Sequence, residues 1–401
     1  MSRLGTLLLV LVALLAGVPG RADAQVRPTF EAGDTALVSP ETERGLVAAI
    51  EAYRAIVAAG GWPTIVSARG LKPNDNDAAV ATLRRRLAIT GDLPAATTST
   101  FYDAALRDAV VRYQMRHGLR PNGVASGLTL AHMNVSAGER LQQLVGNLER
   151  LRASLAKVPR TKYVVVNIPD FELQGVSGGR VELVTRVIVG KRTTPTPEVV
   201  AAVQAVDLLP YWHVPSSIAY RDLVPTIRKD PGYLASKKIR VYSSYGGGEV
   251  DPSEVNWFGE DLQRYTFRQD PGPQNALGLI RLDMPNRHIV YMHDTPMKDL
   301  FGQDERSFSA GCVRVQSVAD VAAWLIGDGT TGQSLLDAAA TGQKTTIKIA
   351  RPVPVHFVYL TAWVSDGVVQ FRNDLYNRDA PPMPEDATAA AVKAPFQSLA
   401  P

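Results

Sequence analysis

One cysteine and one upstream histidine are the residues of this chain whose types suit nucleophilic chemistry. Cys312 is the only cysteine among 401 residues, and His293 precedes it. A thiolate can attack a carbonyl carbon and an imidazole can carry the proton, so the two form a candidate nucleophile and base pair. Gly311 permits a sharp turn and the close approach of a substrate before Cys312. Arg314 adds a fixed positive charge that can lower the thiol pKa or bind a carboxylate.

The competing interpretation is a structural cysteine, because a thiol often acts as a small core hydrophobe. The neighbouring residues favour catalysis, since residues 307–311 are mostly small, polar or turn-forming and do not make a continuous apolar run. A strand is predicted over residues 287–292. It would leave His293 at a strand end, where catalytic residues are often found.

The rest of the sequence argues against metal-dependent, cofactor-dependent and nucleic-acid-binding functions. No two histidines have a metal-ligand spacing and one cysteine cannot build a zinc site, so we expect no metal. We expect no cofactor either, because G-x-G-x-x-G, phosphate-loop and G-x-S-x-G motifs are absent from the sequence. A net charge of +4 without a basic stripe argues against a nucleic-acid partner.

The N-terminus has the pattern of a secretory signal peptide over residues 1–24. Arg3 supplies the positive charge, residues 4–18 form the apolar segment, and Ala22-Asp23-Ala24 is an A-x-A cleavage site. The mature chain is then expected to begin at Gln25. The alternative is an uncleaved anchor, although the apolar segment is short for a membrane span. No later stretch is long and apolar enough for one, so no membrane span is expected after cleavage.

Two helices are predicted on either side of a small module. The first begins after Ser39-Pro40 and ends at Gly60-Gly61, and the second begins at Ser136, whose spacing to Glu139 is a capping box. We expect these helices to pack together as a scaffold from which residues 66–135, with three short helices, project.

From residue 163 onward the pattern changes to strands and indicates an α+β multidomain protein with a mainly β second half. Strands are predicted over 163–168, 181–190, 199–208, 279–283, 289–292 and 345–350, with a hairpin turn over 175–179 and a helix over 318–326. A helical and loop-like insertion over about 215–270 contains the run Gly246-Gly247-Gly248, which predicts either a mobile lid or an ordinary ordered insertion.

Several motifs in one order resemble a known family. The segment His293-Asp294-Thr295-Pro296, followed by Ser309-Ala310-Gly311-Cys312-Val313-Arg314-Val315, resembles the active-site signature of the L,D-transpeptidases with a YkuD-type catalytic domain. Further similarity lies in residues 209–215, 271–278, 351–356 and 359–363, and the resemblance extends from about 36 to 379. It is closest to the long periplasmic murein L,D-transpeptidases that carry a peptidoglycan-binding module. The residues that carry the module's resemblance are Ala109-Val110, Tyr113-Gln114, His117-Gly118-Leu119, Asn122-Gly123 and Thr129.

The resemblance implies a domain plan. The ranges are a signal peptide (1–24), an N-terminal scaffold helix (25–65), a peptidoglycan-binding domain (66–135), a second scaffold helix (136–158), a catalytic domain (159–350), its C-terminal part (351–380) and a disordered tail (381–401).

The resemblance also implies residue roles. Cys312 would be the nucleophile, His293 the general base and acid, Gly311 a backbone contributor to the oxyanion hole, and Arg314 a substrate or pocket residue, with a structural salt bridge as its alternative. One departure stands at Ala310, where many members have a second histidine, which leaves His293 as the nearby base. Candidate groove residues are Ser309, Tyr291, Trp212 and Asp294.

The implied function is peptidoglycan crosslinking in the periplasm. A tetrapeptide stem would form a thioester on Cys312, and the side-chain amine of another stem would complete a 3–3 crosslink, with sensitivity to carbapenems. The implied partners are stem peptides, glycan and other wall-synthesis enzymes. Two alternatives remain: a hydrolase or L,D-carboxypeptidase that uses water as the acceptor, and a catalytically silent wall-binding protein.

Overall fold

The computed structural model describes residues 35–159 and 161–379. The predicted signal peptide, the start of the mature chain and the C-terminal tail therefore lie outside the described residues. Within these two ranges no helix combines the length and the apolar character that a bilayer crossing requires.

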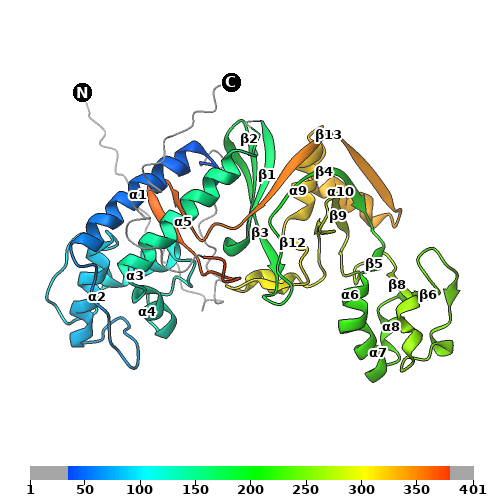
Figure 1. Cartoon of the computed structure of the whole chain (residues 1–401), viewed down its shortest axis with the longest axis horizontal. Helices are drawn as coiled ribbons and strands as arrows, with labels where there is room; N and C mark the ends of the chain where they lie inside the picture. Colours follow the sequence, from blue (N-terminus) through cyan, green and yellow to red (C-terminus); the bar gives the residue numbers. More distant parts are fainter. Residues whose placement is uncertain (1–34, 160, 380–401) are drawn as a thin grey trace, which may run out of the picture.

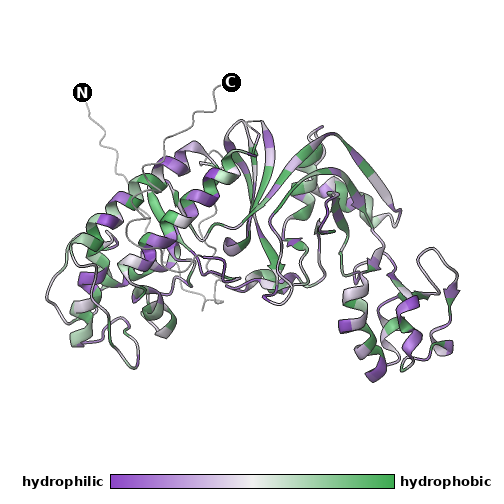
Figure 2. Cartoon of the chain, in the orientation of Figure 1, coloured by the Kyte–Doolittle hydropathy of each residue, from purple (hydrophilic) through white to green (hydrophobic). Residues whose placement is uncertain are grey.

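The two scaffold helices pack side by side (Figure 1). They are α1 (Pro40–Ala58) and α5 (Ala137–Leu155). The Ser39 hydroxyl accepts the Thr42 N–H at 3.1 Å, and Ser136 and Glu139 form the predicted capping box. Buried leucine and isoleucine side chains of both helices share one core, and both helices carry hydrophobic and hydrophilic residues in Figure 2. The predicted scaffold pair is confirmed.

Three short helices form the module between them: α2 (Ala78–Ile89), α3 (Ala104–Arg116) and α4 (Gly127–Met133). Asp77 caps α2 and Asp103 caps α3 through their side chains. A compact apolar core of their inward faces holds them together. The core also encloses an ion pair of Arg116 with Asp92 at 2.6 Å, in which both side chains are under a tenth exposed. The predicted three-helix module is confirmed.

The half of the described chain that is predicted to be catalytic is built on a nine-stranded sheet. Its order is β11-β3-β12-β10-β9-β4-β13-β1-β2. Helices α9 (Val318–Ile326) and α10 (Gly332–Ala340) follow β12 in the chain, and α9 contributes most of the helical side chains to the core cluster. The strands are β1 (Lys162–Asn167), β2 (Glu172–Ser177), β3 (Arg180–Gly190), β4 (Val199–Leu208), β9 (Ile280–Asp283), β10 (Met292–His293), β11 (Ser307–Ser309), β12 (Val313–Val315) and β13 (Thr345–Val358). Two short 3-10 helices connect them, η1 (Ile168–Asp170) and η5 (Lys298–Gly302).

Three strand predictions need correction. The turn predicted over 175–179 is confined to Gly178-Gly179, and Gly175 lies inside β2, where a side chain would meet the Trp324 ring at 3.3 Å. The strand predicted over 289–292 is confined to β10, because Ile289 is 80% exposed and has a positive φ. The last strand of the sheet, β13, continues beyond 350 to Val358.

The insertion over 215–270 is mixed rather than only helical and loop-like. It contains α6 (Ser216–Ile218), η2 (Ala219–Leu223), α7 (Val224–Lys229), α8 (Tyr233–Ser236), η3 (Pro252–Glu254) and η4 (Glu260–Arg264). Its sheet has the order β5-β8-β6-β7 and comprises β5 (Trp212–Val214), β6 (Ile239–Tyr242), β7 (Glu249–Val250) and β8 (Thr266–Gln269). These strands are short, so they carry little periodicity in the sequence. The unit has its own core and projects from the main sheet (Figure 1).

The end of the described chain returns to the scaffold helices. After β13, the hairpin of β14 (Ala362–Ser365) and β15 (Val368–Phe371) packs on α1 and α5. Gly45 of α1 makes this contact possible, because a Cβ there would lie 2.8 Å from the Val364 side chain. The region predicted as the C-terminal part of the catalytic domain is thus shared between the main sheet and the scaffold.

Candidate active site

The candidate nucleophile and base extend from adjacent strands. β10 pairs in parallel with β12, with Met292 opposite Val313 and His293 opposite Arg314. The Val313 N–H donates to the Tyr291 carbonyl at 3.0 Å, which places Tyr291 level with Cys312. Side chains alternate along a strand, so the residues flanking Met292 and Val313 project to the face opposite these two. Tyr291, His293, Cys312 and Arg314 therefore share one face.

The turn before Cys312 is fixed by hydroxyl groups. Gly311 has a φ of 122°, which favours glycine. The Ser309 hydroxyl accepts the Gly311 N–H at 3.1 Å and donates to the Cys312 carbonyl at 2.6 Å. The buried Thr196 hydroxyl donates to the Gly311 carbonyl at 2.8 Å. Ser309, which we expect in the substrate groove, supports this turn through its hydroxyl.

The same turn limits which amide can face a developing oxyanion. The Gly311 N–H is occupied by Ser309. Within residues 35–159 and 161–379, the Cys312 N–H has no hydrogen-bond partner. Of the Gly311 and Cys312 amides, the one available for an oxyanion hole is thus that of Cys312, and the contribution of Gly311 in this structure is the conformation of the turn.

His293 is held as a neutral imidazole. Its ring is 5% exposed, and its Nδ1 contacts the Asp294 backbone carbonyl. Burial, reinforced by the charge of Arg314, lowers the pKa of His293 to about 3. The Asp294 carboxylate points elsewhere, where it accepts the Leu279 N–H at 3.0 Å and pairs with Lys298. A backbone carbonyl, rather than a carboxylate, therefore fixes the imidazole.

Tyr291 connects the thiol, the imidazole and the insertion. Its ring packs edge-on against His293, with centroids 5.6 Å apart. Its hydroxyl lies within electrostatic range of the Cys312 thiol and of the Trp212 side chain on β5. Burial raises the pKa of the half-buried Cys312 thiol, while the contacts with Tyr291 and the charge of Arg314 oppose that rise. The resting pair is consequently a protonated thiol beside a neutral imidazole.

Two guanidinium groups flank His293, and they differ in their partners. Arg281, opposite His293 on β9, donates to Asp207 at 2.9 and 2.7 Å, and the Thr346 hydroxyl donates to the same carboxylate. Arg314 contacts the Met297 sulfur at 3.7 Å, while its buried Nε has no partner among the described residues. No carboxylate of the described chain forms a salt bridge with Arg314, so its charge is available to a substrate.

Sequence reasoning missed Thr196 and the pair of Arg281 with Asp207. Thr196 lies far from Cys312 in the sequence and follows no motif, so only the packing of the loop after β3 reveals it. The pair of Arg281 and Asp207 depends on the register of β9 against β4. A correct alignment of those two predicted strands could have found that pair.

No metal-binding cluster is formed by the histidine, cysteine and acidic side chains of the described residues.

Two family profiles match the chain. Residues 161–349 match the L,D-transpeptidase catalytic domain of the YkuD family. Residues 76–133 match the family described as "Putative peptidoglycan binding domain". The second match includes the module's three helices.

A curated protein of Haemophilus influenzae, named "Putative L,D-transpeptidase", is 32% identical over 241 residues, which are 59% of this chain and 48% of that protein. The chain thus spans about half the length of this relative.

Among solved structures, the L,D-transpeptidase from Mycobacterium smegmatis is 13% identical, with 49% of this chain and 58% of that chain covered and a TM-score of 0.25. The L,D-transpeptidase of Xylanimonas cellulosilytica is 15% identical, with 73% of this chain and 98% of that chain covered and a TM-score of 0.23. Overlaps this weak carry no argument about shape, and the assignment rests on the sequence matches. On those matches the chain combines a YkuD-type L,D-transpeptidase catalytic domain with a putative peptidoglycan-binding domain.

Proposed function

We propose that the protein is a peptidoglycan L,D-transpeptidase that forms 3–3 crosslinks through a thioester on Cys312. The observation that carries this proposal is one face of β10 and β12, where the thiol, Tyr291, the neutral His293 and the unpaired Arg314 are gathered. The substrate is a tetrapeptide stem, cleaved before its terminal D-alanine.

In the first half-reaction, His293 takes the thiol proton while the Cys312 sulfur attacks the carbonyl carbon between positions three and four of the stem. Negative charge develops on the carbonyl oxygen, which the Cys312 N–H faces. The carbon–nitrogen bond then breaks, the amine of D-alanine receives the proton from His293, and a thioester remains. The Tyr291 hydroxyl stabilises the negative charge on the sulfur while Cys312 is a thiolate.

In the second half-reaction, the side-chain amine of another stem attacks the thioester carbonyl. The amine gives a proton to His293, the carbon–sulfur bond breaks, and His293 returns the proton to the departing thiolate. An amide crosslink forms and the enzyme regains its resting state. Because burial lowers the pKa of His293, taking the thiol proton is the uphill step of this cycle, and the resulting imidazolium readily passes the proton on.

Arg314 provides substrate selection. Arg314 is half-buried, and its buried Nε without a partner is unfavourable unless a ligand supplies one. A carboxylate of the stem peptide would satisfy it. We also propose export to the periplasm and a mature chain that begins at Gln25, on the pattern of residues 1–24.

Intact-mass spectrometry after incubation with a carbapenem tests the nucleophile. The unmutated chain should gain one adduct and Cys312→Ala none, with Ser253→Ala, an exposed change on η3 of the insertion, as the control that still reacts. An adduct on Cys312→Ala would contradict the proposal.

Product analysis on isolated tetrapeptide distinguishes the acceptors. Crosslinked dimers support transpeptidation, whereas tripeptide without dimers identifies a hydrolase. Absence of both products, together with no carbapenem adduct on the unmutated chain, would indicate the catalytically silent alternative.

A further inference from the structure

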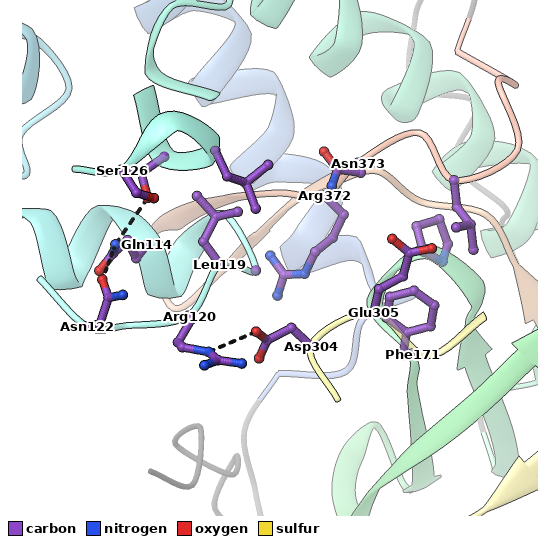
Figure 3. Close-up of a pocket in the computed structure, with 15 residues that line it drawn as sticks. Gln114, Leu119, Arg120, Asn122, Ser126, Phe171, Asp304, Glu305, Arg372 and Asn373 are labelled. Carbon is purple, nitrogen blue, oxygen red and sulfur yellow. Dashed lines mark hydrogen bonds and ion pairs between the residues drawn. The ribbon is translucent and has the colours of Figure 1, made fainter. Parts of the chain in front are cut away.

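A cavity lies where the peptidoglycan-binding module meets the catalytic half of the chain. Its volume is about 170 Å³. One wall comes from α3, α4 and the turn between them, and the other comes from η1, the segment before β11 and the segment after β15 (Figure 3). The module residues that carry the family resemblance, among them Gln114, Gly118-Leu119, Asn122 and Thr129, line the first wall.

The walls are rigid on both sides. The Gln114 side chain donates to Asn122 Oδ1 at 2.9 Å and to the Thr129 hydroxyl at 3.2 Å, and it accepts the Gly123 N–H. Across the cavity, Arg372 pairs with Asp170 and donates to the Arg116 carbonyl at 3.2 Å. The cavity is therefore preformed, as ligand sites usually are.

Arg372 can reach the module only because of Gly118. A Cβ at that position would lie 2.6 Å from the Arg372 Cδ. An ion pair of Arg120 with Asp304, at 3.1 Å, crosses the same boundary near the cavity rim. These two contacts thus hold the two walls of the cavity at a fixed separation.

The lining has an apolar floor and a polar rim of balanced charge. Leu119, Phe171 and Leu375 are each under a tenth exposed and form much of the floor. The charged side chains of the lining are two arginines and two acids, namely Arg120, Arg372, Asp304 and Glu305. A charge-balanced lining gives no net attraction for an anionic peptide and suits a neutral ligand with many hydroxyl and amide groups.

We propose that this cavity binds one N-acetylated amino-sugar unit of the glycan strand, gripped jointly by the module and the catalytic half. The inference rests on the proposed function, which makes peptidoglycan the substrate. The cavity is smaller than the roughly 300–1,000 Å³ that encloses a drug-sized ligand, so it accommodates a single unit of a polymer. The apolar floor accepts the sugar ring face and the acetyl methyl group, and the rim binds the hydroxyl groups.

Joint binding would place the glycan relative to the nucleophile. Asp304 and Glu305 stand just before β11 (Ser307–Ser309), and Ser309 at its end supports the Cys312 turn. A glycan strand bound in the cavity is consequently held at a fixed distance along the protein from the turn that presents the Cys312 thiol. A module that bound the glycan on its own surface would not impose this relation.

The test is a calorimetric titration of the full chain with the tetramer of N-acetylglucosamine, a neutral glycan without stem peptides. We expect saturable binding that weakens at least ten-fold in Glu305→Ala, on the catalytic side, and in Leu128→Asp, on the module side, where Leu128 is 62% exposed. Leu336→Asp introduces the same change on exposed α10 and should bind as the unmutated chain does. Thermal melts of each variant establish that it is folded.

Three outcomes would overturn the proposal. Binding that weakens in Leu128→Asp but not in Glu305→Ala would assign the site to the module alone. Binding that neither change affects would place the glycan elsewhere. Saturation of the cavity by an isolated tetrapeptide stem, with no response to the glycan, would make it a peptide site. Failure of the proposed function has a separate readout, a missing carbapenem adduct on the unmutated chain.

Discussion

Replacing Thr196 by valine should weaken both the fold and the active site, because one buried hydroxyl joins two backbone groups. The Thr196 hydroxyl accepts the Gly190 N–H at 2.8 Å and donates to the Gly311 carbonyl at 2.8 Å. Valine preserves the shape but leaves both groups unpaired in a site with no exposure of residue 196. Each unpaired buried group costs about 1–3 kcal/mol, so we expect a loss of about 3 kcal/mol in the free energy of unfolding.

Activity should fall further than stability alone would explain. The Gly311 carbonyl is one of the anchors of the turn that presents Cys312, and a displacement of about 1 Å can cost on the order of 100-fold in rate. The matched control is Thr196→Ser, which retains the hydroxyl and loses a methyl group worth about 1 kcal/mol. Urea unfolding measures stability, and the rate of carbapenem adduct formation measures the site. If Thr196→Ser proved as impaired as Thr196→Val in both assays, the hydroxyl bridge would not be the cause.

Three further predictions follow from other contacts. Gly278→Ala should slow acylation by at least ten-fold, because Gly278 has a positive φ and its new Cβ would lie 2.3–2.4 Å from the Asp294 side chain, next to His293. Asp92→Ala should lower the free energy of unfolding by about 3–5 kcal/mol in urea titrations, because it leaves the buried Arg116 unpaired. The free energy of unfolding should also fall as the pH drops from about 6.5 to about 3, because the unfolded chain protonates His293 in that window and the folded chain resists it, and a chain with His293→Gln should lose less over the same range.

Matched controls separate these causes from general damage. Gly302→Ala adds the same methyl group at a glycine with no atom within 4 Å of the new Cβ, so acylation should be unaffected. Asp108→Ala removes an exposed ion pair with Arg107 and should change the free energy of unfolding by less than about 1 kcal/mol. An acid dependence that is identical with and without His293 would contradict the third prediction.

Much of the architecture could be predicted because local chemistry marks it. The capping residues Ser39 and Ser136 predicted where the scaffold helices begin, and runs of β-branched residues predicted β3 and β4. The missed elements lack such signals. β2 contains Gly175, which is required by the Trp324 ring above it rather than by a turn, and only the packed structure reveals that requirement. β6 and β7 are too short for a periodic pattern.

The candidate site was predictable in its residues but not in its connections. Cys312, His293 and Arg314 could be recognised in the sequence because their types carry chemistry and a family pattern surrounds them. The group that orients His293 is a backbone carbonyl, which no sequence pattern encodes. Trp212 reaches Tyr291 from the insertion, a contact that depends on how two separate sheets meet.

The return of the β14–β15 hairpin to the scaffold helices has a practical consequence for dissecting this protein. A fragment cut to residues 161–349 would end within β13 and leave behind the strand pairing of Val355–Val358 with β1. It would also lose the hairpin that covers α1 and α5, while those helices, expressed alone, would present an uncovered apolar surface. The two halves are thus mutually dependent for solubility. Separating the proposed wall attachment from the proposed catalysis will require point substitutions within the intact polypeptide, not excision of either half.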